Sequence, residues 1–545
     1  MSKIKIFALG GLNETGKNMY VVNVDENIFI LDAGSMYPDD KMLGIDYIIP
    51  SYDYIKENEK KIKGIFLTHG HDDQIGAVSD IVSALPNIPI YGTEFTIEIL
   101  KSELEEDNIK CNNLNVITPH KSINFGHISI FPISVTHSVP GSVAYVINTP
   151  DGAIVYTGNF IFDQKMQDSY KTDIGKLAYV GKQGVLCLLS ESMYADKKGF
   201  TAPNNRIAPV VNEILDQDDR ILISVFPNQF YKIQELFNGI MHTDRNVVII
   251  GKRLQDIILN SIELKYMEFD VNRIKTISHV NDKNIIVFIA DDREKPFSNF
   301  LRIIKGYDKF IKLNKKDTVL FMSPVFPGME KSSSKLLDGI AKIGCNLIDL
   351  SSKYLSHHAS SEDLMLMINL LNPKYYMPVN GEYRHEVANK KAAIVAGMNE
   401  ENILCKLNGE VVYFKNGKLV NDNIKIPTDE LLIDGEVGDV GEIVLKDREM
   451  LSDNGVVVAV VTIDKSTKKL RHQVEIHSRG FVYVRDNIDV MKEAVNIVTK
   501  VVNDNTKPNF IDYNKVKLGI RDELGKYFYN EIGTKPMILL IVQEI

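Results

Sequence analysis

The feature that most constrains this chain is a cluster of metal-binding side chain types directly after an apolar segment. Residues Ile62–Leu67 have the β-branched and apolar character of a strand, and His69-Gly70-His71-Asp72-Asp73-Gln74 follows at once. Two histidines two residues apart on a strand-to-helix loop can point at one metal ion, and Asp73 can reach a second ion. A lone histidine is usually a surface or core residue, whereas this cluster predicts a metal site.

Other strands in the first third of the chain also end in polar residues. His137 follows the strand-like Ile128–Val135, and Asn159 follows Ala153–Tyr156. Loops held at the ends of sheet strands are where functional side chains gather, so we expect these residues near the histidine cluster. From about Phe200 to Ser352 apolar strands alternate with helical stretches, which predicts a doubly wound α/β insert. The last hundred residues or so have strands and helices of their own and predict a small α/β domain.

Composition excludes several classes of protein. The 545 residues carry a net charge of −9, which argues against binding nucleic acid through bulk charge but leaves room for a local basic groove. Four cysteines form no Cys-x-x-Cys pair, so neither a cysteine zinc site nor a disulfide framework is expected. No apolar run approaches the roughly 18 residues that span a bilayer, and the first residues do not form a signal peptide. We therefore expect a cytoplasmic protein with no membrane partner.

The chain resembles the ribonuclease J family from end to end. The resemblance rests on the His69 loop together with seven further segments, Phe7–Tyr20, Asp32-Ala33-Gly34, Met42–Asp46, His137–Pro140, Gly158-Asn159-Phe160, Pro378–Arg384 and Ser478–Val484. It implies 5′–3′ exoribonuclease action with some endonuclease activity, on two metal ions at a domain interface. Within the family, the sequence is most similar to the second of two paralogues, in which the ligand set is eroded.

The resemblance also implies a fold and its domain boundaries. The expected fold class is α/β, a metallo-β-lactamase αββα sandwich with an inserted doubly wound β-CASP domain and a small C-terminal α/β domain. The expected boundaries are residues 1–200 for the first part of the metallo-β-lactamase domain, 201–352 for the insert, 353–425 for the return segment, 426–447 for a linker and 448–545 for the C-terminal domain.

Three positions depart from the ligand pattern of the family. Gln74, Asn159 and Asn380 stand where the resemblance implies histidine, a bridging aspartate and histidine. The first metal site then keeps His69, His71 and His137, and zinc or manganese is expected there. The second site keeps Asp73 alone and is predicted to be empty, because two divalent ions repel each other and need bridging negative charge.

The resemblance extends to residues that would act on RNA. Asp73, Glu191 and His358 are the candidate catalytic residues, with Glu191 at a position where the family usually has aspartate. Ser360, Ser361 and Lys232 are the candidate phosphate contacts, although on local grounds either serine could equally well be a helix cap. The aspartates Asp291 and Asp292 replace a glycine-and-serine phosphate loop and would repel a phosphate.

Three functional hypotheses remain open from the sequence. In the first, the chain is a weakly active or inactive companion subunit of an active ribonuclease J paralogue, or pairs with itself, and contributes RNA-binding surface. In the second, it is an active exoribonuclease that uses the single three-histidine metal site, or manganese through Asp73 and amide oxygens. In the third, it binds 5′-phosphorylated RNA without cutting it, which the Asp291-Asp292 pair disfavours.

Overall fold

The computed structural model describes residues 2–39, 42–165, 168–217, 219–227, 229–290, 297–325, 329–350, 352–420, 423–435, 438–482, 487–507 and 510–545. Contacts between Cα atoms divide the chain into two units. The first comprises Met1–Tyr37 and Asp46–Leu431, and the second Pro38–Ile45 and Leu432–Ile545. No helix in the described part of the chain is both long and apolar enough to cross a membrane.

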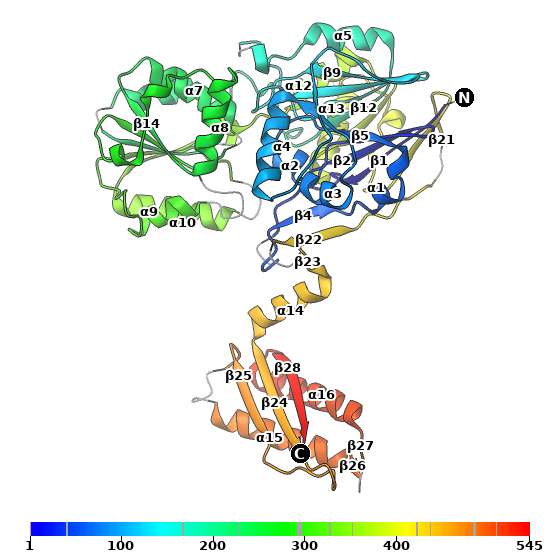
Figure 1. Cartoon of the computed structure of the whole chain (residues 1–545), viewed down its shortest axis with the longest axis vertical. Coiled ribbons are helices and arrows are strands. Elements are labelled where there is room, and N and C mark those ends of the chain that lie inside the picture. Colours follow the sequence, from blue (N-terminus) through cyan, green and yellow to red (C-terminus); the bar gives the residue numbers. More distant parts are fainter. Residues whose placement is uncertain are drawn as a thin grey trace. The chain divides into compact units, whose positions relative to one another are not determined.

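Two sheets pack face to face in the first unit (Figure 1). One has the order β21-β20-β1-β2-β3-β5-β6-β7. Its strands are β1 (Lys3–Gly10), β2 (Met19–Val24), β3 (Asn27–Leu31), β5 (Ile62–Phe66), β6 (Ile90–Thr93), β7 (Leu114–Ile117), β20 (Val412–Lys415) and β21 (Lys418–Val420). The other has the order β19-β12-β11-β10-β9-β8. Its strands are β8 (Ile123–Phe125), β9 (Ile128–Ser134), β10 (Val143–Thr149), β11 (Gly152–Tyr156), β12 (Val185–Glu191) and β19 (Tyr375–Val379).

Helices cover the outer faces of this sandwich. Alternate residues of β9, β10, β11 and β12 point away from the core between the sheets and pack on α5 (Ile174–Gln183), α12 (Ser361–Leu371) and α13 (Tyr383–Val395). On the first sheet, Phe7 of β1 meets Tyr54 of α1 (Asp53–Glu57), and α4 (Glu94–Glu106) packs on β6 and β7. The layers are therefore helix, sheet, sheet and helix, which confirms the predicted αββα sandwich.

The insert is a six-stranded parallel sheet in the order β15-β14-β16-β13-β17-β18. Helices α6 (Ala208–Leu215), α7 (Phe230–Met241) and α8 (Lys252–Glu263) pack on one face, and α9 (Ser298–Ile304) and α10 (Glu330–Ile343) on the other (Figure 1). Because both faces are covered, the central strands β13, β16 and β17 are buried along their whole length. The strands are β13 (Ile221–Ser224), β14 (Asn246–Ile250), β15 (Ile274–Lys275), β16 (Ile285–Ile289), β17 (Thr318–Phe321) and β18 (Asn346–Asp349). The predicted doubly wound insert is confirmed.

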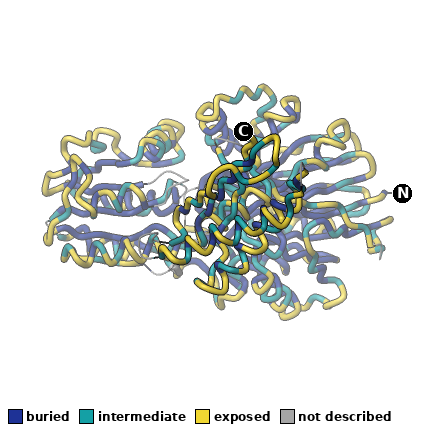
Figure 2. The backbone as a smooth tube through the Cα atoms, turned by 90° about the horizontal axis from the view of Figure 1, so that it is seen from below, coloured by how far each residue is buried: buried dark blue, intermediate teal, exposed yellow. Residues whose placement is uncertain are grey.

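The second unit has a small core of its own. Strand β24 (Val456–Ile463) lies between β25 (Glu475–Arg479) and β28 (Met537–Glu544). Every second residue of β24 is buried against α15 (Ile488–Asp504) and α16 (Tyr513–Ile532), while the residues between them are half-buried. Helix α14 (Gly441–Asn454) begins inside the segment predicted as a linker. Buried stretches of backbone run through the interior of the chain's folded parts, and exposed residues gather at the outer turns (Figure 2).

Candidate metal centre

The metal-ligand residues lie at the ends of neighbouring strands. His69 and His71 follow β5 on the loop that enters α2 (Asp72–Ile75), and His137 comes shortly after β9. Asn159 follows β11, and Asn380 follows β19. Strands β11 and β19 are both parallel to β12, so their carboxyl ends meet at one edge of the second sheet. The sheet topology therefore gathers residues that are far apart in sequence.

Three imidazoles converge on one point. The His69 Nε2 and His71 Nδ1 atoms are 3.2 Å apart, and His71 Nδ1 and His137 Nε2 are also 3.2 Å apart. A tetrahedral zinc ion with bonds of about 2.1 Å needs about 3.4 Å between its nitrogen ligands, so the spacing fits. We compared the His, Cys, Asp and Glu side chains of the described residues as potential metal ligands. His69, His71 and His137 form the group whose ligand atoms all lie within 4.8 Å of one another. The sequence prediction that they come together is met by this geometry.

The other ring nitrogen of each histidine has a hydrogen-bond partner. His69 Nδ1 lies 2.9 Å from Thr68 Oγ1, His71 Nε2 lies 3.1 Å from Ser138 Oγ, and His137 Nδ1 lies 2.9 Å from the carbonyl oxygen of His357. With those nitrogens protonated, the three converging nitrogens are the ones whose lone pairs a metal ion would use. Such outer partners fix both the tautomer and the ring orientation of a metal ligand. Burial holds the pKa of His69 and His137 well below its usual range, so both rings are neutral near pH 7.

Asp32 binds Thr68, the hydrogen-bond partner of His69. No role was assigned to Asp32 from the sequence. Its carboxylate accepts hydrogen bonds from the Thr68 backbone N–H at 2.7 Å, from the Thr68 hydroxyl at 2.9 Å and from the Tyr156 hydroxyl at 2.8 Å. The side chain is fully buried, and burial raises its pKa to about 8. The signal in the sequence was an aspartate at the end of a strand, directly before Ala33-Gly34.

The second half of the site is made of amides. Asn380 Nδ2 donates to Asn159 Oδ1 at 2.7 Å, and Gln74 Nε2 donates to Asp73 Oδ2 at 2.8 Å. Gln74, Asn159 and Asn380 are all at least 99% buried. Asp73, half-buried, is the one carboxylate among these four residues. The structure thus brings Asn159 and Asn380 together as one amide pair and sets Gln74 against Asp73.

A histidine–glutamate pair stands beside the three imidazoles. His358 Nδ1 lies 2.6 Å from Glu191 Oε2, and the His358 and His137 rings are 5.5 Å apart. Glu191 is buried, and its other oxygen accepts the backbone N–H groups of Phe160 at 2.6 Å and Ala359 at 3.3 Å. Burial lowers the pKa of His358, but the charge and hydrogen bond of Glu191 outweigh burial and raise that pKa above its usual value. His358 is one-fifth exposed and therefore reachable from the solvent side.

The candidate phosphate contacts lie in different surroundings. Ser360 is the N-cap of α12, its hydroxyl lies 2.7 Å from Thr201 Oγ1, and its backbone N–H donates to Asp363 at 3.1 Å. Ser361, half-buried, donates its hydroxyl to Glu362. Lys232 is fully buried, and its ammonium contacts the Asn205 carbonyl and, at 2.8 Å, Glu235. Asp291 and Asp292 lie outside the described residues.

A buried glutamate anchors the loop that faces Asn380. Glu386 of α13 accepts the backbone N–H of Asn13 at 2.8 Å, and residues 13 and 14 bridge to residues 382 and 381. Burial raises the pKa of Glu386 to about 8, against the hydrogen bond from Asn13. An unfolded glutamate titrates near ~4.3. Between about pH 4 and pH 8, Glu386 therefore keeps a proton in the folded chain that it releases in the unfolded chain. This contribution to the free energy of unfolding is complete below about pH 4 and is lost as the pH rises towards 8.

We expect Glu386→Gln to make the free energy of unfolding less dependent on pH between 5 and 8. Glutamine keeps the oxygen that accepts the Asn13 N–H but cannot ionise. The measurement is the denaturant midpoint of both proteins across that range, with the exposed Glu401→Gln as control. Parallel pH profiles for Glu386→Gln and the wild type would contradict the assignment.

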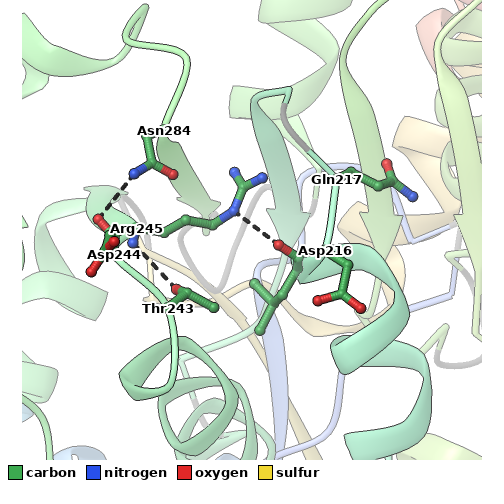
Figure 3. Close-up of a pocket in the computed structure, with 7 residues that line it drawn as sticks. Asp216, Gln217, Thr243, Asp244, Arg245 and Asn284 are labelled. Carbon is green, nitrogen blue, oxygen red and sulfur yellow. Dashed lines mark hydrogen bonds between the residues drawn. The ribbon is translucent and has the colours of Figure 1, made fainter.

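A separate pocket opens in the insert, at the amino ends of β13, β14 and β16 (Figure 3). It has a volume of about 350 Å³ and is lined by Leu215, Asp216, Gln217, Thr243, Asp244, Arg245 and Asn284. The Arg245 guanidinium donates to the backbone carbonyls of Leu215 at 3.3 Å and Asp219 at 2.9 Å. Ligands of open α/β sheets bind at the carboxyl ends of the strands, and this pocket is at the opposite edge. We therefore assign it no role in the site.

Family models match four consecutive parts of the chain. Residues 12–180 match the metallo-beta-lactamase superfamily, and residues 218–340 match the beta-CASP domain of ribonuclease J. Residues 350–401 match the RNA specificity domain of Zn-dependent metallo-hydrolases, and residues 443–545 match the ribonuclease J C-terminal domain. Together with the three-histidine cluster, these matches indicate a metal site.

Relatives match over the whole length. The chain is 36% identical to ribonuclease J2 of Bacillus subtilis (strain 168) over 549 residues, which cover 99% of each chain. It is 35% identical to ribonuclease J 2 of Staphylococcus aureus (strain MRSA252), over 99% of this chain and 98% of that one. A crystal structure of a protein of unknown function from Enterococcus faecalis V583 has the same fold, with a TM-score of 0.53 at 15% identity over 76% of this chain and all of that one. On its domain models and full-length relatives, the chain belongs to the ribonuclease J family, on the side of its second paralogue.

Proposed function

We propose that this chain is a ribonuclease J-type protein of RNA maturation and decay that serves as a companion subunit of an active paralogue and has weak or no nuclease activity of its own. The observation that carries the proposal is the Asn380–Asn159 amide pair at the position of a bridging carboxylate. Two-metal catalysis stabilises both the attacking and the leaving oxygen, and an amide dipole does not hold two divalent ions together. The relatives named ribonuclease J2 support the family assignment.

The residues that remain define what the site can do. His69, His71 and His137 would hold zinc or manganese, and their converging nitrogens suit zinc. Such an ion, when bound, lowers the pKa of a coordinated water. The His358–Glu191 pair can hold or move a proton at His358 Nε2, because Glu191 binds the opposite ring nitrogen. In this proposal the second metal site stays empty, and Asp73 orients its neighbours Gln74 and Asn18 instead of a metal ion.

A second candidate function is a slow exoribonuclease on the single three-histidine site. The complete set of outer partners, Thr68, Ser138 and the His357 carbonyl, favours it. Ser360, Ser361 and Lys232 remain the proposed phosphate contacts in both candidates, with RNA as the partner.

The first experiment measures turnover of a 5′-monophosphorylated RNA by the purified chain with manganese or zinc. The His69→Ala/His71→Ala variant runs alongside, because it reports contaminating nuclease. We expect no turnover above that variant. Turnover that the double variant loses would establish the single-metal enzyme and reduce the companion role to an auxiliary one. Co-elution with the active paralogue of the same organism, as a complex larger than either chain alone, tests the companion role.

Restoring the metal ligands that the family resemblance implies should raise nuclease activity. The triple variant Gln74→His/Asn159→Asp/Asn380→His is expected to raise turnover about 100-fold above the His69→Ala/His71→Ala background, which corresponds to ~2.7 kcal/mol of transition-state stabilisation. Asn380 has a left-handed backbone with φ of 51°, a conformation that histidine also adopts. An unchanged rate in a folded triple variant would place the defect elsewhere, for example at the phosphate contacts.

A further inference from the structure

The amide side of the metal centre is lined by a series of polar contacts that begins at Gln74 and ends at Asn159. We define the amide network as Gln74, Asp73, Asn18, Tyr20, Asn380 and Asn159. Asp73 Oδ2 accepts from Gln74 Nε2 at 2.8 Å and from Asn18 Nδ2 at 3.3 Å. The Tyr20 hydroxyl lies 2.8 Å from Asn18 Oδ1 and 3.0 Å from the Gly11 carbonyl, which also accepts the Asn380 backbone N–H at 2.9 Å. Asn380 then binds Asn159 at 2.7 Å.

The network joins segments that are far apart in the sequence. Asn18 and Tyr20 lie at the start of β2, Gln74 lies in α2, and Asn159 and Asn380 follow β11 and β19. Of these residues, Gln74, Asn159 and Asn380 stand at positions where the family resemblance implies metal ligands. Hydrogen bonds between Asn159 and Asn380 span 221 residues of sequence, and those between Asn18 and Asp73 span 55. The amide network can therefore perform the cross-linking that a metal would otherwise perform.

Three atoms of the network are buried without a partner in the described structure. They are the acceptors Gln74 Oε1 and Asn380 Oδ1 and the donor Asn159 Nδ2. Gln74 is 0% exposed, and Asn159 and Asn380 are each 1% exposed. An unpaired buried polar atom is costly, so native structures give such atoms partners, often water. Two acceptors and one donor match the hydrogen-bonding capacity of water.

The charge of the network argues against a divalent cation. Its one carboxylate, Asp73, already accepts two hydrogen bonds from amide nitrogens. Amide oxygens are weak ligands for zinc, which binds imidazole, thiolate and carboxylate. Asn159 Nδ2 is a hydrogen-bond donor and offers no lone pair to a cation. A neutral, hydrogen-bonding ligand suits these atoms better than an ion.

We propose that the amide network is a metal-free structural cross-link, and that its three unpaired atoms bind water in place of a second metal ion. This role goes beyond the proposed function, because it assigns the altered residues a positive task in folding stability. It holds whether or not the chain cuts RNA. The test therefore uses stability and metal stoichiometry and does not use nuclease activity.

The first arm is a double-mutant cycle in the presence of a chelator. Asn159→Ala and Asn380→Gly each remove one side chain of the pair, and glycine suits the left-handed backbone at position 380. We expect each single variant to lower the melting temperature by about 2–4 °C, and the double variant to lower it by less than the sum. The matched control is Asn148→Ala, which removes an exposed amide hydrogen bond to Ser129 and should change nothing.

The second arm needs no variant and so does not depend on variant folding. The wild-type chain is reconstituted with excess manganese or zinc, desalted, and its metal content measured. We expect one ion per chain, and, in manganese-soaked crystals, anomalous signal at the three histidines with water at the amides. Two ions per chain, anomalous signal at the amides, or wild-type stability for both single variants in chelator would each overturn the proposal.

Discussion

Replacing Asp32 by alanine should weaken zinc binding by the three histidines about 10–100-fold. The buried carboxylate holds Thr68 through both its backbone N–H and its hydroxyl, and Thr68 in turn contacts His69 Nδ1. Without the carboxylate, the His69 ring loses the partner chain that fixes its tautomer and orientation. The measurement is a competition titration against a chromophoric chelator, with circular dichroism to verify the fold.

Two further variants make this result specific. Tyr156→Phe removes one of the donors to Asp32 but leaves Thr68 in place, so its effect on zinc affinity should be much smaller. The exposed Asp107→Ala controls for the removal of a carboxyl side chain elsewhere in the chain. If a folded Asp32→Ala variant binds zinc as tightly as the wild type, Asp32 has no part in the metal centre.

Replacing Arg220 by methionine should destabilise the insert by about 3–5 kcal/mol. Arg220 forms a two-pronged ion pair with Asp317, at 3.0 Å from Nε and 2.7 Å from Nη2, and both side chains are buried. The same guanidinium donates to the carbonyls of Val280 and Lys312 at 3.1 and 2.8 Å. Methionine leaves the Asp317 charge and two carbonyls buried without their partner. The measurement is chemical denaturation followed by a probe in the insert.

The exposed pair Lys342–Asp338 provides the control for this prediction. It spans one helical turn of α10, and its side chains are 74% and 63% exposed. Surface pairs contribute roughly 0–1 kcal/mol, so Lys342→Met should shift the midpoint little. The double variant Arg220→Met/Asp317→Leu should recover part of the loss, because it removes the stranded charge as well. Equal effects of Arg220→Met and Lys342→Met would mean that the buried pair contributes no more to the free energy of unfolding than a surface pair.

Local patterns in the sequence predicted the elements that carry strong periodicity. The predicted strand Ile62–Leu67 is β5 (Ile62–Phe66), and the predicted strand Ile128–Val135 is β9 (Ile128–Ser134). The three metal-ligand histidines could also be predicted, because imidazoles clustered on strand-end loops are typical of metal binding. These inferences succeed because the chemistry sits within a few residues of sequence.

Long-range partners could not be predicted in this way. The carbonyl that holds His137 belongs to His357, 220 residues later, and a carbonyl has no sequence signal. Asp32 has the pattern of an ordinary turn residue until Thr68 and Tyr156 are placed around it. Lys232 is a charged residue whose full burial depends on the Asn205 carbonyl and Glu235. In each case the determining contact comes from tertiary packing.

The order of strands in the first sheet has a consequence for synthesis of the protein. Strand β1, made first, pairs on one side with β2 and on the other with β20, which is made some 400 residues later. Until the ribosome has released residue 415, an apolar and otherwise buried strand is an open edge that can pair with another chain. During most of its elongation, the nascent polypeptide therefore exposes an unpaired strand edge. Chaperone dependence and sensitivity to translation rate should thus centre on the first ten residues.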